Sequence, residues 1–246
     1  MHQKKKTQSV GIEEYARILP QYYSSVMPYT LKKYLTTAGF TSLLDCGCGD
    51  GSLLFALKQH NFFNVKKVLA VDLSKNRVNL VKKIDPRIDA FVDSAETLEK
   101  IKSSSIDFLI AKHVIEHVDD RKMLYAIGRV MKKDGIAYIA TIFKKWYGWY
   151  YYRKDGKWVM DITHLREYMH DEELFDLIDR KKFKILETQK TLLRFPAIDF
   201  LIRRFYMLGL IKNRELFTNN SLFTLLQKIT IPVPGYYNWD IVLKKR

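Results

Sequence analysis

A glycine-rich stretch between an apolar run and an amphipathic run constrains this sequence more than any other feature. Residues 45–51 read DCGCGDG, and they join SLLDCG (42–47) to SLLFALKQ (52–59). The first run predicts a buried strand, and the second predicts the helix that follows it. Glycines at such a junction let a ligand approach the backbone, while the helix N-terminus offers free N–H donors. We therefore predict that a nucleotide-like ligand binds this loop.

The residues around the loop narrow the ligand class. Glycines 47, 49 and 51 spell G-x-G-x-G, and Ser52 stands where a dinucleotide fingerprint requires glycine or alanine, which argues against NAD. Asp72 ends the next apolar run, roughly 20 residues after the glycine loop. In nucleotide-binding folds, a carboxylate at this spacing accepts hydrogen bonds from the ribose hydroxyls. The pattern of strand, loop, helix, strand and acid predicts a nucleoside site.

Apolar runs of strand length alternate with helical patterns through most of the chain. This alternation predicts a parallel sheet with crossover helices. The predicted strands are 42–47, 65–73, 87–93, 105–112, 136–143, 184–190 and 238–245, and the predicted helices between them are 52–59, 75–84, 121–133 and 171–183.

We predict one domain over residues 1–246, because this length and 47% hydrophobic residues allow a single large core. Two segments interrupt the alternation: an aromatic hairpin with a turn at Asp155-Gly156, and a later helical segment. The expected divisions are a helical cap (1–38), a cofactor-binding core (39–143), an aromatic insert (144–163), a core continuation (164–191), a helical insert (192–232) and the last strand (233–246).

Five stretches together resemble the class I S-adenosylmethionine-dependent methyltransferases, especially the small-molecule subgroup that includes ubiquinone-biosynthesis-like enzymes. The stretches are DCGCGDG, VDLS (71–74), VDSAETL (92–98), IDFLIAKHVIEHVDD (106–120) and RVMKKDGIAYIAT (129–141). The resemblance covers about residues 39 to 190. It implies an α/β fold with a Rossmann-like, doubly wound, seven-stranded sheet whose last strand is antiparallel.

The same resemblance implies S-adenosylmethionine as the cofactor. Asp45 and Gly47 would lie near its methionine part, Asp72 would hold the ribose, and Asp93 would sit beside the adenine. The complete expected cofactor set is Asp45, Gly47, Cys48, Gly49, Asp72, Leu73, Asp93, Ser94, Ala95 and His113.

The stretch HVIEH (113–117) has two interpretations. As H-x-x-E-H it matches the inverzincin pattern, in which a helix presents two histidines to zinc. However, IDFLIA, which precedes it, has a strand pattern, so we expect a loop at the carboxyl edge of the sheet, where doubly wound folds bind ligands.

Within this loop we expect His117 to be a general base for an acceptor hydroxyl, with Glu116 beside it. The alternative is a divalent ion held by His113, Glu116 and His117, similar to the Glu-x-x-Glu-His stretch of ubiquinone-pathway O-methyltransferases, with His113 replacing the first glutamate. A third interpretation is that the Glu-His pair only shapes the loop. His164 is a further catalytic candidate, because subgroup members often carry a histidine near this position.

Three functions follow from these patterns. The first is a methyltransferase, O-directed, acting on a glycan, lipid-linked or quinone-like small molecule. The second is an RNA methyltransferase that uses the basic surface, since the formal net charge is +15; against it, AKHV stands where one family of base N-methyltransferases has N-P-P-Y. The third is a non-catalytic binding module with the same fold.

The location follows from what the sequence lacks. No signal-peptide pattern and no apolar run of spanning length occur, and Cys46 and Cys48 form no disulfide framework. We expect a cytoplasmic protein, with peripheral contact to an anionic membrane surface as an option because a basic amphipathic stripe runs through Leu201, Ile202 and Phe205.

Overall fold

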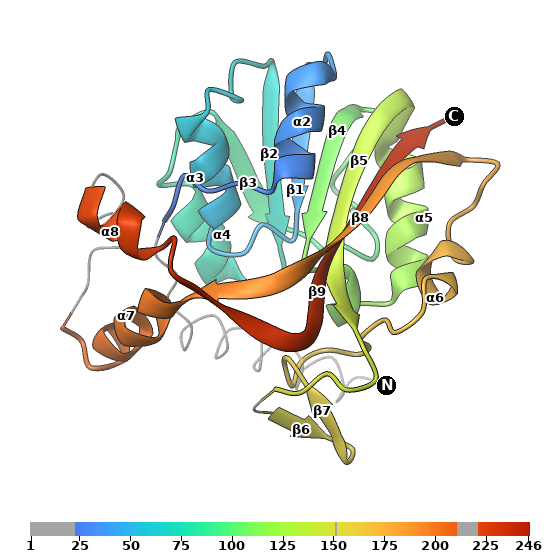
Figure 1. The fold of residues 1–246 in the computed structure, drawn as a ribbon. Helices are drawn as coiled ribbons and strands as arrows, with labels where there is room; N and C mark the ends of the chain where they lie inside the picture. The colour runs from blue at the N-terminus through green and yellow to red at the C-terminus, as the bar shows by residue number, and fades with distance from the viewer. Residues whose placement is uncertain (1–22, 151, 211–220) are drawn as a thin grey trace.

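The computed structural model describes residues 23–150, 152–210 and 221–246 (Figure 1). The expected cap at 1–38 is therefore described only from residue 23, and its helix is α2 (Tyr29–Thr37). The part of the expected helical insert at 211–220 also lies outside the described residues.

A seven-stranded sheet in the order β3-β2-β1-β4-β5-β9-β8 forms the centre of the fold. Strands β3, β2, β1, β4 and β5 are parallel, and β9 is antiparallel to both β5 and β8. The α/β, doubly wound sheet with its last strand antiparallel is thus confirmed. The strands are β1 (Ser42–Cys46), β2 (Lys67–Asp72), β3 (Ile88–Val92), β4 (Ile106–Lys112), β5 (Met131–Lys144), β8 (Phe183–Pro196) and β9 (Thr230–Lys245).

Helices cover both faces of this sheet, because its strands are apolar on both sides. The helices beside the sheet are α2, α3 (Ser52–Gln59), α4 (Lys75–Val81), α5 (Asp120–Val130) and α6 (Glu172–Phe175). Side chains of α2, α3 and α4 share one core cluster, and those of α5 share the other. The switch point lies at β1, whose neighbours are β2 on one side and β4 on the other. The glycine loop follows β1 at this position, where open α/β sheets bind ligands.

Three predicted helices are shorter than expected. The helix predicted at 75–84 ends at Val81. The helix predicted at 121–133 ends at Val130, and Met131 already begins β5. The helix predicted at 171–183 is only the single turn α6. Beyond α6, the side chain of Asp179 accepts the N–H of Lys181 at 2.9 Å. Such local bonds of an aspartate compete with a continuing helix.

Strands β8 and β9 are longer than expected and reach into the segment predicted as a helical insert. Arg194 pairs with Pro232 and Pro196 with Thr230, so the ends of 192–232 are strand. Helices α7 (Ala197–Met207) and α8 (Ser221–Leu226) lie at the far end of this two-stranded arm (Figure 1). Among the described helices, none combines the length and apolarity needed to cross a bilayer.

The predicted aromatic hairpin is present as β6 (Tyr152–Lys154) and β7 (Lys157–Val159). Asp155 and Gly156 both have positive φ, which is the conformation of the two-residue turn that matches strand twist.

Candidate functional site

The glycine loop is fixed to the end of β2 by backbone hydrogen bonds. The N–H groups of Gly47 and Cys48 donate to the carbonyl of Val71 at 2.8 and 2.9 Å. The N–H of Gly49 donates to Asp72 Oδ2 at 2.9 Å. The predicted ribose acid and the predicted glycine loop are therefore in direct contact, at the switch point of the sheet.

The three glycines of the loop have positive φ, but their surroundings differ. A Cβ at Gly47 would lie 2.4 Å from Val114 Cγ2, and one at Gly51 would lie 2.3 Å from Ile84 Cδ1. A Cβ at Gly49 would meet no atom within 4 Å. Gly47 and Gly51 thus serve packing, whereas Gly49 leaves open space above the backbone, as a ligand requires.

Asp72 has capacity for a ligand beyond the bonds it makes. Its other oxygen, Oδ1, accepts the N–H of Ser74 at 2.9 Å, and Arg77 lies 3.7 Å from Oδ2. Two carboxylate oxygens offer about four lone-pair positions, so sites remain for ribose hydroxyls. The next residue, Leu73, is 47% exposed, which leaves an apolar surface beside this acid.

The loop predicted to bracket the adenine is held by Asp93 itself. Its Oδ1 accepts the N–H of Ser94, and its Oδ2 accepts the N–H of Lys100. Asp93 and Ala95 are buried, and the N–H of Asp93 donates to the carbonyl of Asp72. The ribose and adenine candidates thus lie on adjacent strand ends.

Asp45 is buried in β1 with 2% of its surface exposed, and its Oδ2 has no hydrogen-bond partner. Burial and the nearby charge of Asp72 raise the pKa of Asp45 to about 7, and the charge of Lys112 opposes this shift. Sequence reasoning missed Lys112, which ends β4 beside it. Its one signal in the sequence was its position at the end of an apolar run that predicts a buried strand.

HVIEH is not a helix that presents zinc ligands, because Ile115–His117 form a single 3₁₀ turn directly after β4. The inverzincin interpretation is therefore wrong. His113 has a positive φ of 54°, and its N–H donates to the carbonyl of Ala140 on β5. Its ring Nδ1 lies 3.2 Å from Glu116 Oε1, while Glu116 Oε2 accepts the hydroxyl of Thr141. Glu116 is fully buried and fixes this loop to β5.

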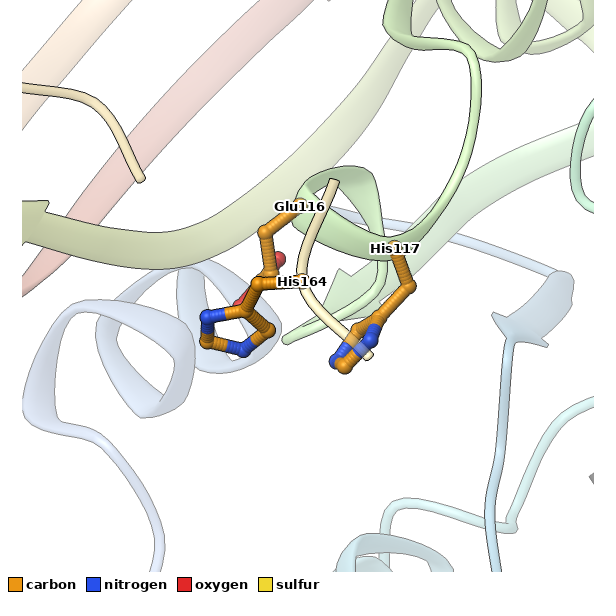
Figure 2. A group of neighbouring side chains, drawn as sticks. All are labelled: Glu116, His117 and His164. Carbon is orange, nitrogen blue, oxygen red and sulfur yellow. The ribbon is translucent and has the colours of Figure 1, made fainter. Parts of the chain in front are cut away.

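Figure 2 shows that Glu116, His117 and His164 converge from two segments far apart in sequence. Their possible ligand atoms all lie within 4.8 Å of one another, and the two imidazole rings meet edge to face with centroids 4.7 Å apart. The structure therefore brings together the three predicted catalytic residues. His113 lies outside this group and contacts only Glu116 within it, so the group that can share an ion is not the trio expected from sequence.

Neighbouring side chains set the tautomers of both histidines. The hydroxyl of Thr163 donates to Asp161 Oδ1 at 2.7 Å, so its oxygen accepts a hydrogen from His117 Nδ1 at 3.0 Å. His164 Nδ1 lies 3.0 Å from Glu167 Oε1, and an ionised carboxylate can only accept. In the neutral form of each ring, the lone pair is therefore on Nε2. Thr163 and Glu167 were missed from sequence because no local pattern shows that they contact these histidines.

Burial lowers the pKa of His117, with His164 adding to this effect and Glu116 opposing it. The imidazole is then neutral near pH 7, which is the form that accepts a proton or binds a metal. The donor set of two imidazoles and one carboxylate also suits a divalent transition metal. Acid-base chemistry and ion binding thus both fit the geometry.

The chain is similar to known methyltransferases. Residues 44–139 match a family model described as a methyltransferase domain. A ubiquinone biosynthesis O-methyltransferase of Bartonella quintana is 22% identical over 158 residues, which are 59% of this chain and 61% of that protein. A ubiquinone/menaquinone biosynthesis C-methyltransferase of Campylobacter jejuni is 32% identical over 127 residues, 49% of this chain and 50% of that protein. The chain thus spans about half to three-fifths of the length of these curated relatives.

A solved structure of similar fold is the geranyl diphosphate C-methyltransferase of Streptomyces coelicolor, in complex with Mg²⁺, geranyl diphosphate and S-adenosyl-L-homocysteine. It has a TM-score of 0.57 and 16% identity, covering 88% of this chain and 77% of that one. At this identity the likeness shows the fold alone. None of these three proteins is described as acting on nucleic acid, so the RNA alternative gains no support. Residues 44–139 thus match a methyltransferase domain, and the chain is similar to methyltransferases of ubiquinone biosynthesis.

Proposed function

We propose that this protein transfers the methyl group of S-adenosylmethionine to a hydroxyl of a small-molecule acceptor. The observation that carries the proposal is that the nucleoside elements and His117 lie at the carboxyl ends of adjacent parallel strands, and that His164 contacts His117 there. Asp72 and the glycine loop follow β2 and β1, and His117 follows β4. Carboxyl ends of neighbouring parallel strands meet at one edge, so donor and acceptor can be held side by side.

In this proposal, His117 Nε2 takes the proton of the acceptor hydroxyl as the oxygen attacks the methyl carbon of the sulfonium. The C–O bond forms as the C–S bond breaks, the sulfur leaves as a neutral thioether, and the proton stays on His117. Glu116 then stabilises the imidazolium, since its carboxylate faces the same group. A sulfonium is already a good leaving group, so we expect the base to contribute about 10²-fold to 10⁴-fold.

The acceptor class is supported by the surface near the histidines. The hairpin and its flanks expose Trp146, Tyr147, Trp149 and Tyr152, and Arg153 stacks on Trp158. His164 is linked to this hairpin, because Lys154 Nζ donates to its carbonyl at 2.6 Å. Aromatic faces with cations suit ring-bearing, glycan or phosphate-bearing acceptors. The relatives named for quinone biosynthesis favour a quinone-like or lipid-linked acceptor among these.

We also propose that the arm formed by β8, β9, α7 and α8 contacts an anionic membrane surface. Large apolar side chains remain exposed on it, namely Leu201, Phe205, Leu208, Leu210, Leu222, Leu225, Ile229 and Ile231. The exposed cations Arg204 and Lys228 lie among them, within a chain of net charge +15. Apolar side chains with surrounding positive charge are complementary to anionic lipid headgroups.

The test of methyl transfer is the formation of S-adenosylhomocysteine with a panel of catechol, quinol and glycolipid acceptors. We expect turnover with one of these classes, a fall of about 10²-fold or more in kcat for His117→Gln, and little change in cofactor affinity. His170→Gln, an exposed histidine, is the matched control and should keep full activity. A kcat unchanged in His117→Gln would rule out the base, and loss of activity with a chelator would indicate that the same group holds an ion.

A further inference from the structure

The chain that returns from the aromatic hairpin makes one tight turn against the loop that carries His117. The N–H of His164 donates to the carbonyl of Asp161 at 3.2 Å, which closes the turn. The next N–H along the chain, that of Leu165, donates to the carbonyl of Glu116 at 2.8 Å. The turn is therefore fastened by its backbone to the residue directly before His117.

Within this turn, Asp161 fixes the side chain of Thr163. Asp161 Oδ1 accepts the N–H of Thr163 at 2.8 Å and its hydroxyl at 2.7 Å. An aspartate that accepts the backbone N–H two residues later is a common element of turns. Because the hydroxyl hydrogen is donated to Asp161, the oxygen of Thr163 is an acceptor for His117 Nδ1, which lies 3.0 Å away. The three side chains thus form a continuous chain of hydrogen bonds.

A carboxylate at the end of such a chain affects the step that His117 performs in the proposed function. The ring becomes positively charged when Nε2 takes the proton of the acceptor hydroxyl. In serine proteases, a carboxylate behind Nδ1 holds the imidazole in the correct tautomer and stabilises the imidazolium. Here the hydroxyl of Thr163 stands between the ring and the carboxylate of Asp161, and hydrogen bonds in a chain polarise one another.

We propose that Thr163 and Asp161 are positioning residues for His117, and that the three side chains act as one hydrogen-bonded triad. This inference rests on the proposed function, because it concerns the base of that reaction. The triad keeps the lone pair on Nε2, where it can accept the proton. No proton passes along it: the proton of the acceptor stays on Nε2, and Nδ1 keeps its own. The aromatic insert (144–163) then supplies part of the base as well as a surface for the acceptor.

The first test examines the ring directly and needs neither cofactor nor acceptor. Long-range proton–nitrogen NMR of the full chain, labelled with ¹⁵N-histidine, identifies the ring nitrogen that carries hydrogen at about pH 8, where an imidazole is neutral. The spectrum of His117→Gln assigns the signals of His117. We expect hydrogen on Nδ1 in the wild type and in Thr163→Ser, which keeps the hydroxyl.

Thr163→Val replaces this hydroxyl with a methyl group of similar size. It should shift His117 toward the tautomer with hydrogen on Nε2, because Nδ1–H has then lost its acceptor. A wild-type ring with hydrogen on Nε2 would overturn the triad. The same tautomer in the wild type, Thr163→Ser and Thr163→Val would also overturn it.

The second test measures methyl transfer to the best acceptor of the panel described above. Thr163→Val should lower kcat about tenfold to a hundredfold, as expected for a hydrogen bond to a charged group, and change the acceptor KM and the dissociation constant of S-adenosylhomocysteine less than about twofold. Thr163→Ser should restore most of the kcat. Thr37→Val is the matched control, since it removes an exposed hydroxyl of α2 that donates to the carbonyl of Lys33, and it should leave all three constants unchanged.

Double variants separate a positioning role from a structural one. In the His117→Gln background, Thr163→Val should cause no further loss of kcat, because its effect acts through the imidazole. Asp161→Asn should lower kcat by itself and add nothing to Thr163→Val, because its charge reaches the ring through that hydroxyl. Additive losses would show that the turn only supports the fold, and they would overturn the triad.

The outcomes distinguish this inference from the proposed function. If His117→Gln lowers kcat and Thr163→Val does not, the triad is overturned and the base remains. If His117→Gln keeps the wild-type kcat, the base is overturned and the triad with it. A wild type that forms no S-adenosylhomocysteine with any acceptor of the panel overturns the proposed function and, with it, the role of the triad.

Discussion

At the scale of one residue, Asp45 belongs to the candidate site but lowers the stability of the fold when it is ionised. Its carboxyl is enclosed in β1 without a partner for Oδ2, and its pKa is raised by burial to about 7. In the unfolded chain an aspartate ionises near pH 3.9. Ionised Asp45 therefore costs the folded state free energy, as is common where a binding site is held ready for a charged ligand.

The substitution Asp45→Asn should reveal this cost as a pH-dependent gain in stability. Because the folded-state pKa is the higher one, wild-type stability falls as pH rises from about 4 to about 7 and then levels off. The asparagine side chain of the variant does not ionise, so its advantage should be absent below pH 4 and largest above pH 7, at most about 4 kcal/mol. Urea unfolding at pH 4 and pH 8 measures it. An advantage independent of pH would contradict the buried, unpaired carboxylate.

At the scale of an element, the loop between β1 and α3 combines glycines that serve packing with one that serves a ligand. Gly49 has open space where a Cβ would stand, although the loop around it is crowded. Gly156, in the hairpin turn, has the same two properties of positive φ and open space, but it lies away from the predicted cofactor. The two positions form a natural pair for comparison.

Gly49→Ala and Gly156→Ala should lose similar stability, about 1 kcal/mol each, because both place an alanine in the left-handed region. Only Gly49→Ala should also lose affinity for S-adenosylhomocysteine, since its methyl group enters the space left for the ligand. Thermal unfolding and titration calorimetry measure the two effects. Equal cofactor affinity in both variants would show that the space above Gly49 is not where the ligand lies.

At the scale of the whole molecule, the arm formed by β8, β9, α7 and α8 is distinguished by the large apolar side chains that are exposed on it. The variant Leu222→Ser with Leu225→Ser should reduce sedimentation with phosphatidylglycerol vesicles by several-fold, because it removes apolar area from the proposed membrane face. Tyr125→Ser is the control, an exposed apolar residue on α5, far from α8 in Figure 1. Binding should weaken in high salt and on phosphatidylcholine vesicles. If the protein does not bind vesicles and instead forms dimers that depend on the same leucines, the exposed face of the arm is the contact with a second copy of the chain.

The sequence predicted the sheet and the cofactor loop because both depend on local patterns. Apolar runs, glycines and the spacing to Asp72 lie within short windows, and they placed most of the parallel strands to within a few residues. The lengths of β8 and β9 were underestimated, because residues such as Arg194 and Pro232 are held in strands by pairing with each other. Tertiary pairing of this kind overrides local propensity.

The candidate site was predictable residue by residue but not as a geometry. His117 and His164 could be named separately, yet their contact depends on the chain returning to the sheet edge after the hairpin. Lys112 gave only a weak signal, because a lysine that ends a strand is usually solvated. Its neighbours Asp45 and Asp240 come from β1 and β9, which no local pattern brings together.

The most direct test of the central claim is calorimetric titration of the purified chain with S-adenosylhomocysteine, in wild type and in Asp72→Ala. We predict saturable one-to-one binding in the wild type and a loss of at least about tenfold in affinity in Asp72→Ala, since the ribose then loses its charge-assisted acceptor. Wild type without binding, or an unchanged dissociation constant in Asp72→Ala, would contradict the assignment of the nucleoside site to the end of β2.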